Sequence, residues 1–400
     1  MRLMDDLTIK IGNDLKHKIW AGAEKASTFD LPMVSVIVVN YNYGRFLRQA
    51  VDSIFAQNYP NIECIIVDNA STDESAEVLL EIAADYPSAV VLRRARNEGQ
   101  CAACVDGFAA SSGEYIVFLD ADDVLVSAFV ETHVFVHLSL RLPVGLTSSD
   151  MMQALNSRIV LSTIRGDNAQ ALEKTKNTAD LLRNFDSICP EFWPLQKMDA
   201  SIKAQVRLIE PMNVASWVWS PTSGNCFRRD ALDLFIGDPA LPGLRYAIDT
   251  YLIRGISVLT GSVLIDRPLS IYRMHGGNGF TKHPHLHGVL NYDRFGPNDL
   301  DLRSREMIID HCVANARMFN SRLHEASCFI RALEAINDIW PPLRSRNNAA
   351  KSYLAERLET EADALADVFG RKLVAYWRAR QRHSIIRALK AWGARLLPRK

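Results

Sequence analysis

The sequence lacks both an apolar run that could cross a membrane and a net charge that would attract nucleic acid. None of its hydrophobic stretches approaches the roughly 20 residues that a transmembrane helix requires. The segment from Met1 to Lys25 mixes acids with bases and has no apolar signal core. Lys and Arg together number 46, as do Asp and Glu, so the formal net charge is zero. We therefore expect a cytoplasmic protein that binds no nucleic acid.

Cysteine is also scarce, with seven residues scattered along the chain. Their odd number, and the place of Cys64 inside a predicted buried strand, suit a reducing compartment better than a disulfide scaffold. Cys101 and Cys104 form a Cys-x-x-Cys pair, which has no second pair to match it. Because this pair falls within a predicted helix, packing thiols are favoured over the alternative of a redox or zinc site.

Two early segments, residues 34–39 and 62–67, are rich in β-branched and aliphatic side chains and are predicted to be buried strands. Each ends in a polar loop. The first loop leads into a predicted helix over residues 45–57, and the second into a helix expected to begin after Ser71 or Thr72 as N-cap. This βαβ alternation predicts a largely parallel sheet with a ligand site beyond the carboxyl ends of its strands.

A third predicted strand, residues 114–119, ends abruptly in Asp120-Ala121-Asp122-Asp123. Three neighbouring carboxylates repel one another unless a cation neutralises them. An Asp-x-Asp pair holds two carboxylates within reach of one hard divalent ion, which prefers oxygen ligands. The alternative is a solvated acidic turn, since Asp is a good turn former. The two earlier strands that end in polar loops favour the cation site.

These segments together resemble the nucleotide-sugar half of an inverting family 2 glycosyltransferase with the GT-A fold, over residues 32–134. The resemblance rests on the order and spacing of the runs VSVIVVNYNYGRFLRQAVDSIFAQNYPNIECIIVDNASTDES, NEGQCAACVDGF and GEYIVFLDADD. It implies an α/β fold with a Rossmann-like mixed, mostly parallel sheet flanked by helices. Val105 departs from the pattern, because the family often carries a second Asn there.

The resemblance implies a donor site for a nucleoside-diphosphate sugar. Asn40 and Tyr41 would line the base pocket. Asp68 would bond the base, which favours a UDP or dTDP sugar, although this side chain could instead cap its turn. Asp120 would hold the ribose or the metal, and Asp122 would bind the metal directly, with Mn²⁺ or Mg²⁺ as the expected ion.

Three further residues lie in segments that approach the donor in similar sequences. Asn97 and Gly99 either contact the donor or shape the loop that enters the next helix, since glycine allows unusual dihedrals. Asn225, in the segment 221–229, offers both a hydrogen-bond donor and an acceptor.

The later part of the chain supplies the expected base and a closing loop. Residues 246–256 are predicted to be helical, with Asp249 in the first turn, where similar sequences place the acid of their general-base motif. The alternative for Asp249 is a simple complement to the helix dipole. The motif Tyr-Arg-x-His-Gly-Gly-Asn resembles the family's closing loop. It would bring His275 to the metal or diphosphate and Arg273 to phosphate oxygens.

We divide the chain into an N-terminal extension (1–31), a catalytic domain (32–297) and a helical C-terminal region (298–400). Helices are expected over residues 310–333, 349–369 and from 371 onward. The last segment is basic and amphipathic, so two roles stay open. It could lie on the anionic inner face of the cell membrane, or pack against the catalytic domain or another subunit; the oligomeric state is open.

The sequence thus predicts a metal-dependent inverting glycosyltransferase, in which Asp249 deprotonates a hydroxyl of a glycan, a lipid-linked or another acceptor. Two rival functions differ from this one. A nucleotidyltransferase can share the sheet, but its phosphate loop is usually rich in glycine, unlike residues 40–45 here. A catalytically inactive nucleotide-sugar-binding homologue would lack turnover, and retention of Asp68, Asp122, Asp249 and His275 weighs against it.

Overall fold

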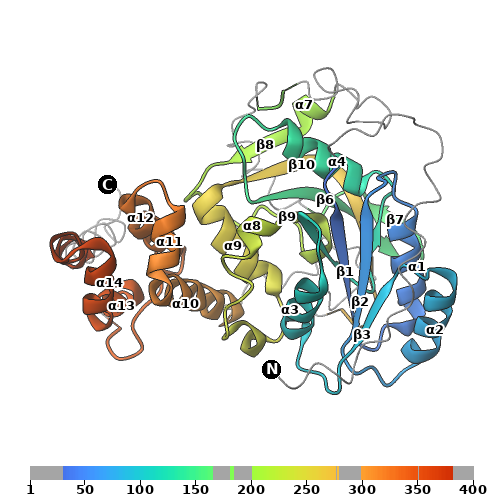
Figure 1. Ribbon diagram of the computed structural model, residues 1–400, viewed down its shortest axis with the longest axis horizontal. Coiled ribbons are helices and arrows are strands. Elements are labelled where there is room, and N and C mark those ends of the chain that lie inside the picture. The colour runs from blue at the N-terminus through green and yellow to red at the C-terminus, as the bar shows by residue number, and fades with distance from the viewer. Residues whose placement is uncertain are drawn as a thin grey trace, which may run out of the picture.

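The computed structural model describes residues 30–164, 181–183, 201–275, 277–278, 299–349 and 351–381. The strands are β1 (Val34–Asn40), β2 (Ile62–Asp68), β3 (Val90–Arg93), β4 (Tyr115–Asp120), β5 (Val124–Leu125), β6 (Leu146–Leu155), β7 (Arg158–Leu161), β8 (Val206–Ile209), β9 (Asn225–Arg228) and β10 (Ser262–Met274). They form one sheet in the order β3-β2-β1-β4-β9-β6-β10-β5, with β7 beside β6 and β8 beside β10 (Figure 1).

The sheet is mixed and mostly parallel around its first strand, as predicted. Strand β1 runs parallel to both β2 and β4, and β3 continues that parallel set beyond β2. Strand β9 is antiparallel to β4 and β6, while β6 and β10 are parallel to each other. The expected α/β fold, with a mixed sheet flanked by helices, is therefore confirmed.

Helices cover both faces of this sheet. Those of the α/β part are α1 (Gly44–Phe55), α2 (Ser75–Asp85), α3 (Gln100–Ala110), α4 (Phe129–Ser139), α7 (Ile202–Gln205), α8 (Arg229–Leu232) and α9 (Ile248–Thr260), with 3₁₀ turns η2 (Thr222–Gly224) and η3 (Leu241–Leu244). Alternate residues of β1 face opposite layers, as in any strand. Val36 and Val38 pack with α1, α2 and α4, whereas Ile37 and Val39 pack with α3 and α9. The β1 run is apolar throughout because both faces are buried.

The predicted N-cap of the second helix is wrong. Helix α2 begins at Ser75, and neither Ser71 nor Thr72 caps it. Instead the Ser71 hydroxyl accepts a hydrogen bond from the Asn42 N–H at 2.9 Å, and the Thr72 N–H donates to Asn42 Oδ1 at 2.8 Å. Ser71 and Thr72 thus connect the loop after β2 to the loop after β1, and α2 begins after them, at Ser75.

The C-terminal region is helical, but its helices are shorter than predicted. They are α10 (Asp299–Ala314), α11 (Ala316–Arg322), α12 (Ala326–Asn337), α13 (Tyr353–Thr360) and α14 (Ala362–Phe369), followed by helical residues 371–381. The expected single helix over 310–333 is interrupted at Asn315 and again from Leu323, whose backbone is extended. The Asn315 side chain bonds the His311 carbonyl at 3.0 Å, which is the kind of local bond that competes with helix continuation.

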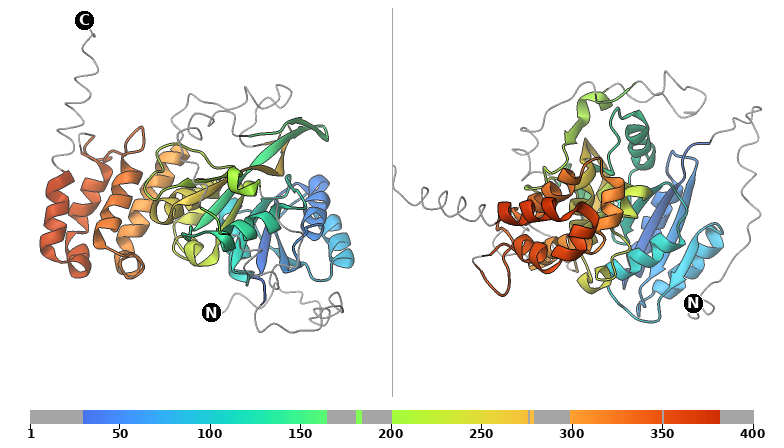
Figure 2. Two further views of the ribbon diagram at one scale, coloured as in Figure 1. Left: turned by 90° about the horizontal axis from the view of Figure 1, so that it is seen from above. Right: turned by 60° about the vertical axis from the view of Figure 1, so that its left-hand side comes forward.

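These helices stack as a layered unit against α9 (Figure 2). They share one continuous apolar core with the α3 and α9 side of the sheet. Val374 and Trp377, on the predicted amphipathic segment, are each 2% exposed and belong to that core. For residues 371–381, packing on the protein is thus the role that the structure shows. The rest of that segment, residues 382–400, lies outside the described residues, as does most of the N-terminal extension.

No helix in the described ranges combines the length and the apolar character needed to span a bilayer.

The Cys-x-x-Cys pair behaves as packing thiols, as predicted. Cys101 and Cys104 are both fully buried in α3, and burial raises the pKa of the Cys101 thiol to about 12.

Candidate functional site

The sheet order reverses at β1, so the ligand crevice expected of an open α/β sheet lies beyond the carboxyl ends of β1 and β4. Strand β1 lies between β2 and β4, and the chain moves outward through β2 and β3 before returning to the other side of β1. Ligands of open α/β sheets bind at such a reversal. The register pairs Asn40 with Asp68 and Val39 with Asp120, so three predicted site residues end adjacent strands at this edge.

Asn40 organises the loops on the β2 side of the crevice. Its buried amide nitrogen Nδ2 donates to Asp68 Oδ1 at 3.0 Å, to Ser71 Oγ at 3.1 Å and to Ser75 Oγ at 2.9 Å. This amide therefore fixes the Asp68 carboxylate, which is 7% exposed. The next residue, Tyr41, is 41% exposed at the strand end. A role of these residues in base binding stays a prediction.

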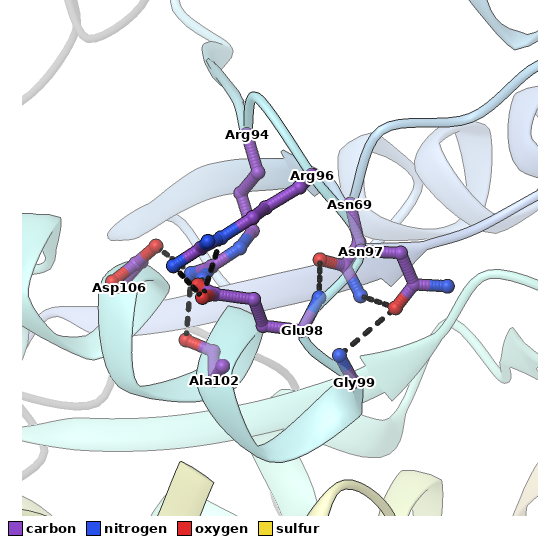
Figure 3. Close-up of polar contacts among 8 residues, drawn as sticks. All are labelled: Asn69, Arg94, Arg96, Asn97, Glu98, Gly99, Ala102 and Asp106. Atoms are coloured by element: carbon purple, nitrogen blue, oxygen red, sulfur yellow. Dashed lines mark hydrogen bonds and ion pairs between the residues drawn. The ribbon is translucent and has the colours of Figure 1, made fainter.

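Asn97 and Gly99 shape the loop before α3 (Figure 3). Asn97 Oδ1 accepts hydrogen bonds from Asn69 Nδ2 and from the Gly99 N–H, each at 2.9 Å. Gly99 has a φ of +95°, and a Cβ atom there would lie 2.3 Å from the carbonyl oxygen of Arg245. The structure thus shows the loop-shaping role for both residues, and direct contact with a donor stays a prediction.

The same close-up shows an ionic cluster on the outer side of this loop. Arg94 pairs with Glu98 and Asp106, and Arg96 bonds Glu98 from the exposed side (Figure 3). The Arg94 guanidinium also donates to the Ala102 carbonyl at 3.2 Å, within the first turns of α3. This cluster braces the loop against α3.

Three carboxylates gather where β4 ends. Asp122 and Asp123 are 7% and 1% exposed. Burial, reinforced by the neighbouring Asp122 charge, raises the pKa of Asp120 to about 7. Burial, together with the charges of Asp122 and Asp120, also raises the pKa of Asp123 well above its ordinary value. Ionised carboxylates are therefore unfavourable here, because they are buried and repel one another. A bound cation would reduce both penalties.

Residues of the turn η2 form hydrogen bonds with these acids. The Thr222 hydroxyl bonds the Asp120 carboxylate, and the Ser223 hydroxyl bonds the Asp123 carboxylate. Ser223 Oγ also accepts from the Asp120 backbone N–H at 3.1 Å. Asn225 is fully buried behind this turn, and its Nδ2 donates to the carbonyls of residues 220–222 at 2.8 to 3.3 Å. Asn225 thus supports the turn, and its contact with a donor stays a prediction.

Asp249 enters the site from the other half of the domain, in the first turn of α9 as predicted. Its Oδ1 accepts from the Thr250 N–H at 2.8 Å, and the Thr222 backbone also bonds this carboxylate. Burial raises the pKa of Asp249, while these backbone N–H groups lower it in part. The negative charge of Asp249 contributes to the raised pKa of Asp120, so the two carboxylates lie close enough to interact.

The closing motif reaches the same acids. His275 Nε2 lies 2.9 Å from Asp122 Oδ2, and Asn278 Nδ2 donates to that oxygen at 3.4 Å. The Arg273 backbone N–H donates to Asp123 Oδ1 at 3.2 Å. From the other side of the crevice, the Tyr43 hydroxyl donates to the Gly277 carbonyl at 3.2 Å.

The Arg273 side chain lies against the Phe46 ring. Its guanidinium carbon lies 5.0 Å from the centroid of the Phe46 ring, and its Nη2 atom is buried with no hydrogen-bond partner among the described residues. Burial lowers the pKa of Arg273, although the Asp123 and Asp122 charges oppose this. A buried guanidinium nitrogen without a partner is suited to a phosphate oxygen.

The donor set fits a hard divalent cation. Carboxylate oxygens of Asp120 and Asp122 and the imidazole of His275 are ligands that Mn²⁺ accepts, and the first two also suit Mg²⁺. Among the residues that the structure describes, no three His, Cys, Asp or Glu side chains are already arranged as a metal-binding group. His275 and Asp122 instead face each other directly. The roles of Asp120, Asp122 and His275 as ligands stay predictions.

Some residues at this edge were not singled out from the sequence. They are Tyr43, Gln100, Asp123, Thr222 and Ser223, and each falls inside a run that the sequence already marked. The signal for Asp123 was its place beside Asp122. The hydroxyl residues of η2 carry no local signal, because their partners lie a hundred or more residues earlier in the chain.

Comparisons with known proteins show which family this segment of the chain resembles. Residues 35–136 match the model of the family described as glycosyl transferase family 2. An uncharacterized glycosyltransferase of Nostoc sp. is 30% identical over 246 residues, which cover 61% of this chain and 66% of that protein. Glycosyltransferase GlyG of Streptococcus pneumoniae is 36% identical over 100 residues, 25% of this chain and 33% of its own length. The chain thus spans less than two thirds of these relatives.

A solved structure, Staphylococcus aureus TarS 1-349 in complex with UDP, superposes with a TM-score of 0.48 at 15% identity. It covers 92% of this chain and 93% of that one. The family match falls on the segment that carries Asn40, Asp68, Asp120 and Asp122. Residues 35–136 thus carry a glycosyl transferase family 2 segment, and the chain is similar to a glycosyltransferase over 246 residues.

Proposed function

We propose that this protein is a metal-dependent, inverting glycosyltransferase that moves a sugar from a nucleoside diphosphate to a hydroxyl group of an acceptor. The observation that carries the proposal is the gathering of Asp120, Asp122 and Asp123 where β4 ends, with the charge of Asp249 in the first turn of α9 contributing to the raised pKa of Asp120. The match of residues 35–136 to glycosyl transferase family 2 supports the reaction class, and the contacts described above support the division of roles.

Asp68 and Arg273 are the proposed donor contacts at opposite ends of the crevice. Asp68, oriented by Asn40, would accept a hydrogen bond from the N–H of a pyrimidine base, which makes UDP or dTDP sugars the proposed donors. Arg273 would bind a diphosphate oxygen through its unpartnered Nη2 atom. Asp120, Asp122 and His275 would hold a divalent cation, which when bound offsets charge on the leaving diphosphate.

Asp249 is the proposed general base. A carboxylate takes up the acceptor proton more readily when its pKa lies above the usual range, and burial raises the pKa of Asp249. The acceptor oxygen would then attack the anomeric carbon from the side opposite the diphosphate, so one direct displacement inverts that centre. A glycan or a lipid-linked saccharide is the proposed acceptor, and the inner side of the cell membrane or the cytoplasm is the proposed location.

Thermal-shift screening of the full chain with Mn²⁺ and a panel of nucleotide sugars tests the donor site. Ligands that bind only the folded state raise the melting temperature. We expect UDP or dTDP sugars to raise it more than GDP or ADP sugars do, and EDTA to remove the difference. Absence of a shift with every nucleotide would refute the donor site. Binding without donor turnover in the presence of acceptor mixtures would favour the inactive homologue.

A further inference from the structure

Gln100, the first residue of α3, lies between the two halves of the proposed site. Its Nε2 atom donates to Asp120 Oδ1 at 2.6 Å, and its Oε1 atom accepts from the Ala247 N–H at 3.1 Å. We infer that Gln100 is a positioning residue that fixes the start of α9, and with it Asp249, relative to the acids at the end of β4. The inference rests on the proposed function, since it concerns the reaction at that site.

The backbone beside Gln100 makes a second contact with the segment that enters α9. The Cys101 N–H donates to the Arg245 carbonyl at 3.2 Å. Gly99 approaches the same carbonyl so closely that a Cβ atom would lie 2.3 Å from it. The first turn of α3 therefore holds the α9 entry through three consecutive residues, 99–101, and only Gln100 connects this contact to the acids.

The entry segment needs such support because its backbone is unfavourable. Arg245 and Ala247 have φ values of +66° and +60°, in the left-handed region that residues with a Cβ atom adopt only when their surroundings hold them there. Ala247 is also buried, so its N–H requires a partner inside the protein. Gln100 supplies that partner two residues before Asp249. If this bond is lost, we expect the first turn of α9 to shift, and a displacement of about 1 Å is costly in a catalytic site.

Glutamine is suited to this place because its amide carries both a donor and an acceptor. The Asp120 carboxylate needs a donor, whereas the Ala247 N–H needs an acceptor. Glutamate at this position would keep the acceptor but would repel Asp120. Methionine has a similar length and provides neither strong group. Of these three side chains, glutamine alone satisfies both partners at once.

The test compares Gln100→Met and Gln100→Glu with a matched control, Gln381→Met. Gln381 is 4% exposed, and its amide donates to the Glu334 carboxylate at 2.8 Å in the C-terminal helices, away from the sheet edge. The measurements are kcat with the donor found in the nucleotide-sugar screen, Kd for UDP with Mn²⁺, melting temperature, and amide hydrogen exchange of the peptide 244–252.

For Gln100→Met and Gln100→Glu we expect kcat to fall at least tenfold and exchange of residues 244–252 to become faster. For Gln100→Met we also expect Kd for UDP to stay within threefold. We expect Gln381→Met to lower the melting temperature with no change in kcat or in that peptide. The inference is overturned if Gln100→Met keeps kcat within twofold of wild type or leaves exchange of the peptide unchanged. Hydrogen exchange needs no substrate, so this part of the test decides the inference even if the proposed function is wrong. Failure of the proposed function would be seen separately, as a wild-type chain that neither binds UDP nor turns over a donor.

Discussion

His275 Nε2 lies 2.9 Å from Asp122 Oδ2, although 153 residues separate the two in the chain. Asp122 ends the acidic run after β4, and His275 follows directly after β10, two strands that are not neighbours in the sheet. Both side chains are about nine-tenths buried, at 10% and 11% exposure. The contact links the loop after β4 to the end of β10 and brings together two of the three proposed metal ligands.

Asp122→Asn should abolish transfer while the protein stays folded. The substitution keeps the size of the side chain and a hydrogen-bonding group for His275, but removes the charge that a divalent ion requires. Turnover with excess Mn²⁺, together with Mn²⁺ binding measured by calorimetry, checks this. If the variant keeps near wild-type turnover in the presence of EDTA, Asp122 is not a metal ligand.

Asp249→Asn should lower kcat by about two to four orders of magnitude, which is the usual share of general-base catalysis. Because Asp249 is not proposed to bind the nucleotide, Kd for UDP should stay within about threefold. Asp363→Asn is a matched control, since Asp363 also lies in the first turn of a helix, α14. If Asp249 served only the helix dipole, both variants would lower stability slightly, and neither would change kcat.

Asp301→Asn should destabilise the junction between α9 and the C-terminal helices. The Asp301 carboxylate pairs with both Arg254 of α9 and Arg305 of α10, whose side chains are 6% and 0% exposed. Removing one partner of a buried ion pair leaves uncompensated charge, at a cost of about 3 kcal/mol. Urea unfolding at pH 7.5 measures it.

The exposed pair Arg346 and Glu306 provides a contrast to this junction. The Arg346 side chain is 77% exposed, so Arg346→Gln should cost less than about 1 kcal/mol. Equal effects of Asp301→Asn and Arg346→Gln would show that the junction is not held by the buried network.

His137→Gln should reduce the loss of stability in mild acid. Burial lowers the pKa of His137 to about 4, and its Nε2 atom contacts the Cys226 carbonyl at 3.3 Å and Thr147 Oγ1 at 3.2 Å. An unfolded chain protonates this group near pH 6.5, so the native state loses stability as pH falls from about 6.5 toward 4. The loss from this residue between pH 7.5 and pH 5 is about 2 kcal/mol.

Urea unfolding at both pH values, for wild type and His137→Gln, isolates the contribution of His137 from those of other groups. The variant should lose less stability than the wild type over this interval. An identical pH dependence in the two proteins would show that His137 is not held neutral in the native state.

Two truncations should separate the roles of the C-terminal segment. A chain that ends at residue 370 loses Val374 and Trp377 from the core, so it should be destabilised by at least about 3 kcal/mol. A chain that ends at residue 383 keeps them and should retain its melting temperature and its turnover of a soluble acceptor. For residues 384–400 the membrane role predicts binding of the full chain to anionic vesicles at low salt through basic and apolar side chains, whereas the packing role predicts none. If the full chain does not float with such vesicles at low salt, the membrane role is wrong.

The sequence alone located three strands of the sheet and the polar character of their ends. Periodicity of apolar residues located β1, β2 and β4, because a strand buried on both faces is apolar throughout and its end is where polar side chains resume. The acids at residues 120–123 and Asp249 in the first turn of a helix were predictable for the same reason. These are local properties, set by neighbours along the chain.

Tertiary structure decided which of these groups meet and how each is held. Sheet order brings His275 to Asp122, and the packing of α9 against α3 lets Gln100 reach both Asp120 and Ala247. It also decided that Val374 and Trp377 enter the core, although their spacing alone equally suited a membrane surface. The spacing of apolar residues along a helix predicts that its apolar face is covered. It does not predict what covers that face, because the partner comes from a remote part of the chain.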